Sequence, residues 1–382
     1  MSEELNNNEE IENVEFINED ADSDYSNDDL FNITSWGADL SFRELINMYD
    51  DDELLKPELQ RKYVWERPEA SRFIESILLG LPIPSIFLAN TSENNKLIID
   101  GYQRIMTVYD FVKKGVFSKD NKVFKLTNNK KINHRWRGKS YNELTELDQK
   151  KIRQTTIHAI IFEQKHPKEN DSSLFQIFER INTSGKILKS QEIRNCVYQG
   201  NLNKLLFKLN TNETWRTLYG TVEEDSRMSD LEFILRFFAL AQDEIKNKNE
   251  GQISLKLFLN DFMGNKDNNK KNKIEALESD FVNTINQIHT FIGINAFKNI
   301  NNENTYLSRF HPTIFDSISI ATSYAIKKGI DISRIENLAQ KHIELLNNPN
   351  FKEYSSNRTT NLENINGRIN LASQILFGLN YE

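Results

Sequence analysis

The run from Leu97 to Phe111 constrains the fold of this 382-residue chain more than any other stretch. Its first three residues, Leu97 to Ile99, form a short apolar run that is typical of a buried strand. Gly101 interrupts the run, and from Ile105 onward apolar residues recur at helical spacing. The sequence therefore predicts a strand, a tight glycine turn and a helix. The free N–H groups of the first helical turn would face the space beyond the strand end, where an anion is the natural occupant.

Two charged residues flank this turn. Arg104 would lie in the first turn of the helix, where a cation opposes the macrodipole at a cost of about 0.3–1 kcal/mol, so we expect it to face a phosphate or a carboxylate. Asp100 could cap the helix, hold Arg104 or face a metal ion carried by a nucleotide. The alternative is an ordinary strand-to-helix turn with a surface arginine, and residues 100–104 alone favour that interpretation.

Three segments in the same order resemble the DUF262 family, which includes the N-terminal domain of GmrSD-type, modification-dependent restriction enzymes. The first comprises LQRKYVW at 59–65 with IESILLGLPIP at 74–84, and the last is FERINTSG at 178–185 with Leu188 and Glu192. Between them, DGYQR at 100–104 is similar to the DGQQR signature of the family. The resemblance covers about residues 38–200, and it departs from the family pattern at Tyr102, where Gln is usual.

The resemblance implies an α+β chain, with a mixed N-terminal domain related to the ParB/sulfiredoxin fold and an all-helical C-terminal domain. In that fold a Gly-x-x-Arg turn binds nucleotide phosphates. By this resemblance the phosphate-binding residues would be Gln60, Arg61, Gly101, Arg104 and Asn182. The catalytic candidates would be Asp100, Gln103 and Arg104. We expect no metal-binding cluster of protein side chains, but Mg²⁺ could accompany a nucleoside triphosphate, with Asp100 facing the ion.

Residues 113–139 form a basic stretch that suggests a second function. They contain ten Lys and Arg residues against Asp120 alone, with Phe117, Phe124 and Trp136 interleaved. Clustered positive charge with aromatic side chains is typical of phosphate contacts combined with base stacking. A solvated hairpin insertion explains the pattern equally well. For the first alternative, the candidate nucleic-acid-binding residues are Lys130, Lys131, Arg135 and Arg137.

The acidity of the chain is concentrated at its start. The formal net charge is −8, but residues 1–35 hold twelve Asp and Glu residues and no Lys or Arg. The remainder has 44 acidic against 48 basic residues. We therefore expect residues 1–35 to be a disordered acidic tail, residues 36–190 to be the nucleotide-binding domain, and residues 191–382 to be the helical domain.

Several classes of protein are excluded by what the sequence lacks. It has no GxxxxGK[ST] phosphate loop, no dinucleotide-binding fingerprint and no cysteine or HExxH zinc pattern. The histidine spacing does not match an HNH nuclease, so cleavage would need the N-terminal site or a separate nuclease partner. We expect no signal peptide and no membrane span, and the single Cys196 fits a reducing cytoplasm.

These observations and the resemblance together lead to two alternatives. The first is a nucleotide-binding, NTP-hydrolysing, DNA-directed component of a bacterial restriction or anti-phage system, with phosphodiester cleavage at the same site as a variant. The second is a non-catalytic DNA-binding regulator or sensor subunit that acts with a separate nuclease.

Overall fold

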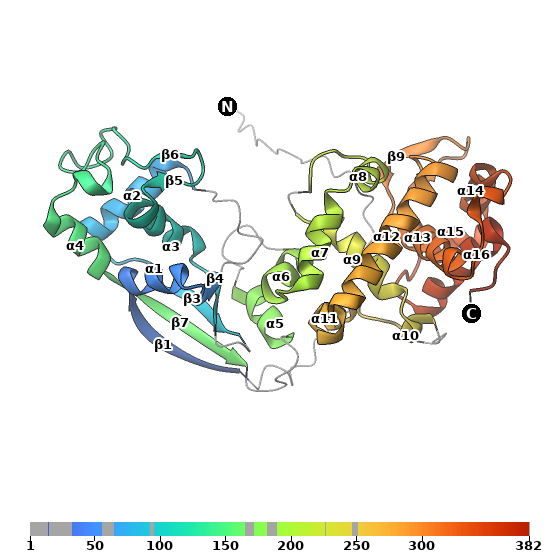
Figure 1. Ribbon diagram of the computed structural model, residues 1–382, viewed down its shortest axis with the longest axis horizontal. Coiled ribbons are helices and arrows are strands. Elements are labelled where there is room, and N and C mark those ends of the chain that lie inside the picture. The colour runs from blue at the N-terminus through green and yellow to red at the C-terminus, as the bar shows by residue number, and fades with distance from the viewer. Residues whose placement is uncertain are drawn as a thin grey trace, which may run out of the picture. The chain divides into compact units, whose positions relative to one another are not determined.

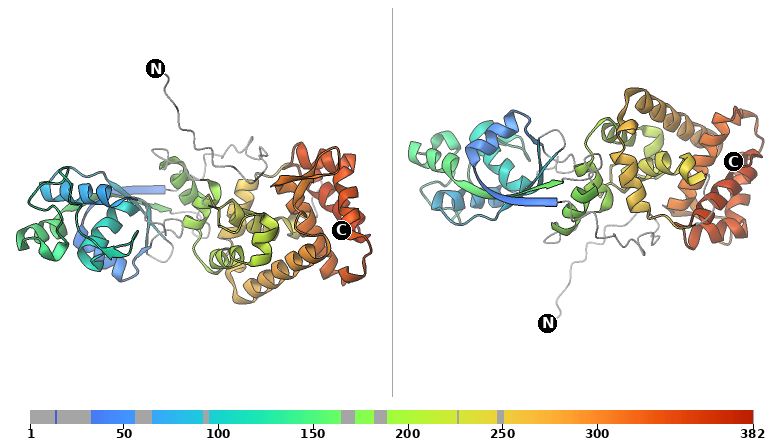
Figure 2. Two further views of the ribbon diagram at one scale, coloured as in Figure 1. Left: turned by 90° about the horizontal axis from the view of Figure 1, so that it is seen from above. Right: turned by 90° about the horizontal axis from the view of Figure 1, so that it is seen from below.

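The protein consists of two compact units, Ser26–Tyr198 and one built mainly of Gln199–Glu382 (Figure 1). The computed structural model describes residues 14, 33–55, 65–91, 95–164, 172–181, 189–225, 227–246 and 251–381. The first unit contains a five-stranded sheet with helices, and the second is mostly helical (Figures 1 and 2). The expected α+β class is confirmed.

The sheet of the first unit has the order β1-β7-β3-β4-β2. These strands are β1 (Ile33–Ser41), β7 (Thr156–Gln164), β3 (Ile86–Asn90), β4 (Lys96–Asp100) and β2 (Leu54–Leu55). β1 and β7 are antiparallel, β3 and β7 are parallel, and β2 is parallel to β4. β3 and β4 form the antiparallel hairpin that the sequence predicts from two short apolar runs with Asn94-Asn95 between them. β1 was not predicted from the sequence, because its apolar residues do not form a continuous run and only Ala38 and Leu40 of them pack against the core.

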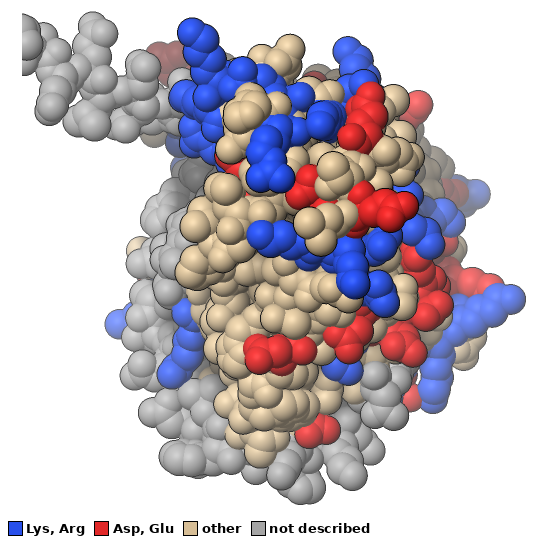
Figure 3. Space-filling view, turned by 90° about the vertical axis from the view of Figure 1, so that its left-hand side faces the viewer, with Lys and Arg blue, Asp and Glu red and all other residues tan. Residues whose placement is uncertain are grey.

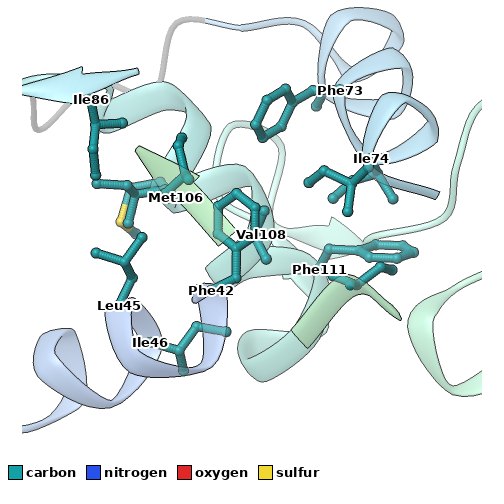
Figure 4. Packing of buried hydrophobic residues seen from close by; sticks show 14 of the residues in the cluster. Phe42, Leu45, Ile46, Phe73, Ile74, Ile86, Met106, Val108 and Phe111 are labelled. Carbon is teal, nitrogen blue, oxygen red and sulfur yellow. The ribbon is translucent and has the colours of Figure 1, made fainter. Parts of the chain in front are cut away.

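Three helices pack on the sheet and form the main core with it (Figure 4). They are α1 (Phe42–Asp50), α2 (Arg67–Leu79) and α3 (Tyr102–Tyr109). α1 begins with the capping box that its sequence indicates, since Glu44 N donates to Ser41 Oγ at 3.2 Å and Ser41 N donates to Glu44 Oε2 at 2.7 Å. α2 has Pro68 in its first turn, where proline loses no helical hydrogen bond.

The basic stretch folds beside α2. It follows a π-helical turn at Asp110–Lys114 and contains the short antiparallel pair β5 (Val116–Phe117) and β6 (Lys122–Val123). A 3-10 turn at Tyr141–Glu143 and α4 (Glu146–Gln154) then lead into β7. The unit ends with α5 (Ser172–Ile181) and α6 (Ser190–Val197).

The second unit contains ten α-helices within its described residues. They are α7 (Asn201–Asn210), α8 (Glu213–Tyr219), α9 (Ser229–Leu240), α10 (Asp243–Lys246), α11 (Leu255–Gly264), α12 (Lys271–Phe291), α13 (Pro312–Lys327), α14 (Leu338–Asn347), α15 (Pro349–Ser356) and α16 (Leu362–Phe377), with 3-10 turns at Lys266–Asn269 and Ile332–Arg334. None of the helices among the described residues combines the length and apolar character that crossing a bilayer requires.

This unit departs from the all-helical expectation in one place. β8 (Lys298–Ile300) and β9 (Tyr306–Phe310) form an antiparallel hairpin. Phe310 at the end of β9 is buried, and its ring lies 4.6 Å from that of Phe233 and 5.5 Å from that of Phe315. The two strands have only three and five residues, too few for an alternating apolar pattern to stand out in the sequence.

The acidic N-terminal segment is described only in part. β1 begins at Ile33, so the last three residues assigned to the tail belong to the sheet. Val14 forms an isolated parallel bridge with Phe310. The other residues before Ile33 lie outside the described ones, and the expectation of disorder there stays a prediction.

Candidate phosphate-binding turn and basic pocket

The expected strand, glycine turn and helix are all present. β4 ends at Asp100, Gly101 has a φ of 102°, and α3 begins at Tyr102. A Cβ atom on Gly101 would lie 2.3 Å from Ile86 Cγ2, so both the backbone conformation and the packing require glycine here. Ile105 N donates to Gly101 O at 3.0 Å, and among the described residues no side-chain cap is present at the N-terminus of α3. We call residues 100–104 the Gly101 turn.

Arg104 holds the Gly101 turn to the segment that precedes β3. Its Nη1 donates to the backbone oxygens of Pro84 at 2.8 Å and Ser85 at 2.5 Å, and its Nη2 donates to Asp100 Oδ2 at 2.5 Å. The side chain of Arg104 is 14% exposed, whereas that of Asp100 is 43% exposed. Asp100 therefore holds Arg104, which is one of its three expected roles. The Asp100 carboxylate still reaches solvent.

The other two side chains of the turn also make internal contacts. Gln103 Oε1 accepts a hydrogen bond from Trp65 N at 3.3 Å. Tyr102, where the family pattern usually has Gln, is only 5% exposed and belongs to the core. Burial, with smaller contributions from Tyr49 and Asp110, raises the pKa of the Tyr102 phenol well above its usual value. The phenol is therefore a core group that stays neutral.

Three of the phosphate-binding candidates cannot be placed. Gln60, Arg61 and Asn182 lie outside the described residues, in the segments 56–64 and 182–188. Their expected roles stay predictions. Trp65, which contacts Gln103, directly follows the first of these segments in the chain.

The aromatic residues of the basic stretch are not available for base stacking, so that part of the interpretation is wrong. Phe117 and Phe124 are each 1% exposed and Trp136 is 3% exposed. The Phe117 and Phe124 rings lie 4.8 Å apart, and Trp136 Nε1 donates to Asp148 Oδ2 at 3.1 Å. Their spacing in the sequence reflects a small core beneath the loop.

Three of the ten cations of this region are paired with acids from elsewhere in the unit: Lys113 with Asp50 at 2.8 Å, Lys125 with Glu143 at 3.0 Å, and Lys119 with Glu66. The one acid of the stretch, Asp120, is paired with Arg67 of α2 at 2.7 Å. Hydrogen bonds from Ser140 and from Lys125 lower the pKa of Glu143 to about 2. The count of ten cations against one acid therefore overstates the free positive charge, because it ignores acids brought in from outside residues 113–139.

The four candidate nucleic-acid-binding residues have different environments in the structure. Arg137 donates from Nε and Nη2 to the oxygen of Ile132, at 3.1 and 2.8 Å, and so supports its own loop. The Arg135 guanidinium lies 5.5 Å from the centre of the Trp136 ring. Lys130 and Lys131 are exposed and line a pocket. In the face of the molecule that Figure 3 shows, Lys and Arg side chains gather at the upper edge.

This pocket has a volume of about 400 Å³ and lies between α2 and the loop that follows β6. We call it the basic pocket. Its lining residues are Pro68, Arg72, Thr127, Asn129, Lys130, Lys131 and Ile132. Arg72 could not be predicted to join this pocket, because it lies on α2, more than 50 residues before the two lysines in the chain. In the sequence, the only indication of Arg72 was its position on the exposed side of an amphipathic helix.

Among the described residues, no group of three or more His, Cys, Asp or Glu side chains could hold a metal ion. At the Gly101 turn, Asp100 is the carboxylate that a nucleotide-borne Mg²⁺ could meet. Its exposure fits that role, and the remaining ligands would have to come from phosphate oxygens and water.

Residues 42–199 match the model of the family described as GmrSD restriction endonuclease, N-terminal domain. A search of the curated proteins finds no match to the chain. The matched segment begins at the first residue of α1 and ends two residues after α6, so it includes both the Gly101 turn and the basic pocket. The resemblance read from the three motifs is therefore confirmed over this segment.

Proposed function

Because residues 42–199 form a domain of the GmrSD restriction endonuclease N-terminal family, we propose that this protein is a DNA-directed component of a restriction or defence system whose Gly101 turn binds a nucleoside triphosphate. The observation that carries the proposal is the uncapped N-terminus of α3, directly after a buried strand and a left-handed glycine. Such a terminus presents N–H groups and the positive end of the helix dipole to an anion.

Each charged residue of the turn has a role in this proposal. Arg104 fixes the turn through Pro84, Ser85 and Asp100, and its positive charge stands beside the phosphate position. Asp100 faces the ion that accompanies the triphosphate. Mg²⁺, when bound, neutralises phosphate charge and polarises the phosphoryl group. Gln103, Gln60 and Asn182 would add hydrogen bonds and Arg61 would add positive charge, as the family resemblance implies.

Calorimetric titration with ATP, GTP and CTP tests the nucleotide part of the proposal. In Mg²⁺ we expect the wild-type protein to bind at least one of them, and Asp100→Asn to bind it more weakly. In EDTA the same substitution should not weaken binding, because it removes a negative charge near the phosphates. Arg104→Gln should weaken binding about tenfold, on the order of the 1.5–3 kcal/mol of a charged hydrogen bond. Failure of the wild-type protein to bind any of the three would contradict the proposal.

A second candidate function is favoured by the internal contacts of the turn. Tyr102 is a core residue and Arg104 is bonded to its own domain, so both residues also have purely structural roles. A non-catalytic DNA-binding regulator or sensor that acts with a separate nuclease would need only these structural roles of Tyr102 and Arg104. Turnover assays distinguish the two functions: nucleotide binding without release of inorganic phosphate, with and without DNA, favours the regulator.

A further inference from the structure

The three cations that line the basic pocket share one feature, which is that no acid among the described residues compensates their charges. Among the described residues, the side chains of Arg72, Lys130 and Lys131 make no ion pair and no hydrogen bond. Nearby, Lys125 and Arg67 are each paired with an acid. Three unpaired cations around one pocket repel each other, and a bound anion would relieve that repulsion.

The loop that presents the two lysines is firmly attached to α2. Thr127 N donates to Ser71 Oγ at 3.0 Å, and Asn133 N donates to Glu75 Oε1 at 2.6 Å. Between these two anchors, Ile132 is 1% exposed. Because the loop is fixed before and after residues 128–132, the pocket is pre-formed, and a ligand would not have to order it.

The rest of the lining suits a phosphate with an organic neighbour. Arg72 offers a planar guanidinium that can bind two phosphate oxygens at once. Asn129 adds an amide, and the exposed Pro68 supplies an apolar surface, while Ile132 forms the buried floor beneath the loop. The volume of about 400 Å³ falls in the range of ligand pockets and exceeds what a bare phosphate needs.

We propose that the basic pocket binds a backbone phosphate of nucleic acid, with the adjoining sugar against Pro68, at a site separate from the Gly101 turn. This inference rests on the proposed DNA-directed function. A polymer is favoured over a free phosphate because Arg135, three residues after Ile132 in the chain, is also exposed and makes no ion pair among the described residues, so that a further phosphate could be neutralised there. The pocket anchors the polymer, while the turn is left for the nucleotide.

The test compares two triple variants of the full chain that lose the same charge. The pocket variant carries Arg72→Gln, Lys130→Gln and Lys131→Gln. The control variant carries Lys122→Gln, Lys139→Gln and Lys150→Gln, on side chains of the same unit that line no part of the pocket and make no ion pair in the described structure. Thermal melting should show both variants folded like the wild type, since the substituted side chains contribute little to the core.

Fluorescence anisotropy with a short duplex, from 0.05 to 0.2 M salt, gives the decisive numbers. We expect the pocket variant to bind at least about tenfold more weakly at 0.05 M, and the log–log salt slope to fall by about 0.9, for the one phosphate that is no longer neutralised. The control variant should stay within about threefold of the wild type. Equal losses of affinity in the two variants would overturn the inference, because net charge alone would then explain them.

Two further outcomes separate this inference from the function on which it rests. If the wild-type protein does not bind duplex or single-stranded DNA at 0.05 M salt, the DNA-directed function fails and the inference fails with it. If the pocket variant binds DNA normally but has lost the ability to bind inorganic phosphate or a mononucleotide, the pocket is a free-phosphate site. That result overturns the inference and leaves the proposed function intact.

Discussion

The Gly101 turn and the basic pocket lie in the same unit and both carry arginine, but their charges are used differently. Arg104 in the turn is 14% exposed and donates to Asp100 and to two backbone oxygens. Arg72 in the pocket is exposed and makes no polar side-chain contact in the described structure. The comparison teaches that the number of cations in a segment says little about which of them can bind a ligand. Pairing within the fold decides it.

The largest expected effect is on folding stability, at the glycine of the turn. Gly101→Ala places a Cβ 2.3 Å from Ile86 Cγ2 in a left-handed conformation. Overpacking and backbone strain together should cost about 2–5 kcal/mol. Urea denaturation of the full chain measures the change in the free energy of unfolding, with circular dichroism as the signal.

Gly115→Ala is the matched control. Gly115 also has a positive φ, 66°, but a Cβ there would have nothing within 4 Å. We expect a cost of about 1–2 kcal/mol, from the backbone conformation alone. Equal losses of stability for the two alanine variants would show that Gly101 is needed only for its backbone, and that packing against Ile86 is not what fixes the turn.

A somewhat smaller loss of stability is expected at Tyr102. Replacing it with Gln, the usual residue of the family pattern, exchanges a ring that is 5% exposed for a polar amide in the core. We expect about 2–4 kcal/mol of destabilisation, against less than about 1 kcal/mol for Tyr102→Phe. If Tyr102→Gln were neutral in stability and raised NTP turnover, the turn would be a catalytic site that tolerates the family residue, and its assignment to the core would be wrong.

The sequence predicted local features of the fold better than long-range ones. The capping box at Ser41, the hairpin of β3 and β4, and the turn at Gly101 were all recognisable, because each depends on neighbouring residues. β1 and the β8–β9 hairpin were missed, because strands without a clear apolar pattern become visible only through the elements that they pair with.

The same distinction applies to the candidate site. The residues of the Gly101 turn were found from a local motif, but their contacts with Pro84, Ser85 and Trp65 could not be predicted from it. In the basic stretch, periodicity could not show that Phe117 and Trp136 are buried. Arg72 was missed because its approach to the lysines depends on how a loop packs on α2.

A small effect is expected from cations that are already paired. Lys119→Gln with Lys125→Gln removes two charges from the basic stretch, and both lysines are paired with glutamates in the structure. We expect duplex affinity at 0.15 M salt to change by less than about threefold, because the charge of each lysine is already compensated by its glutamate. A loss as large as that of Lys130→Gln with Lys131→Gln would mean that the ion pairs open on DNA binding.

The central claim is that the turn and the pocket bind different phosphates, and duplex affinity of Arg72→Gln against Arg104→Gln tests it most directly. Both proteins are measured at 10 °C and 0.05 M salt, with circular dichroism confirming that each is folded. The account predicts that Arg72→Gln loses roughly fivefold or more in DNA affinity, as expected for one phosphate contact, while Arg104→Gln stays within about twofold of the wild type. A loss for Arg104→Gln that equals or exceeds that for Arg72→Gln would contradict it, because the DNA would then depend on the turn as much as on the pocket.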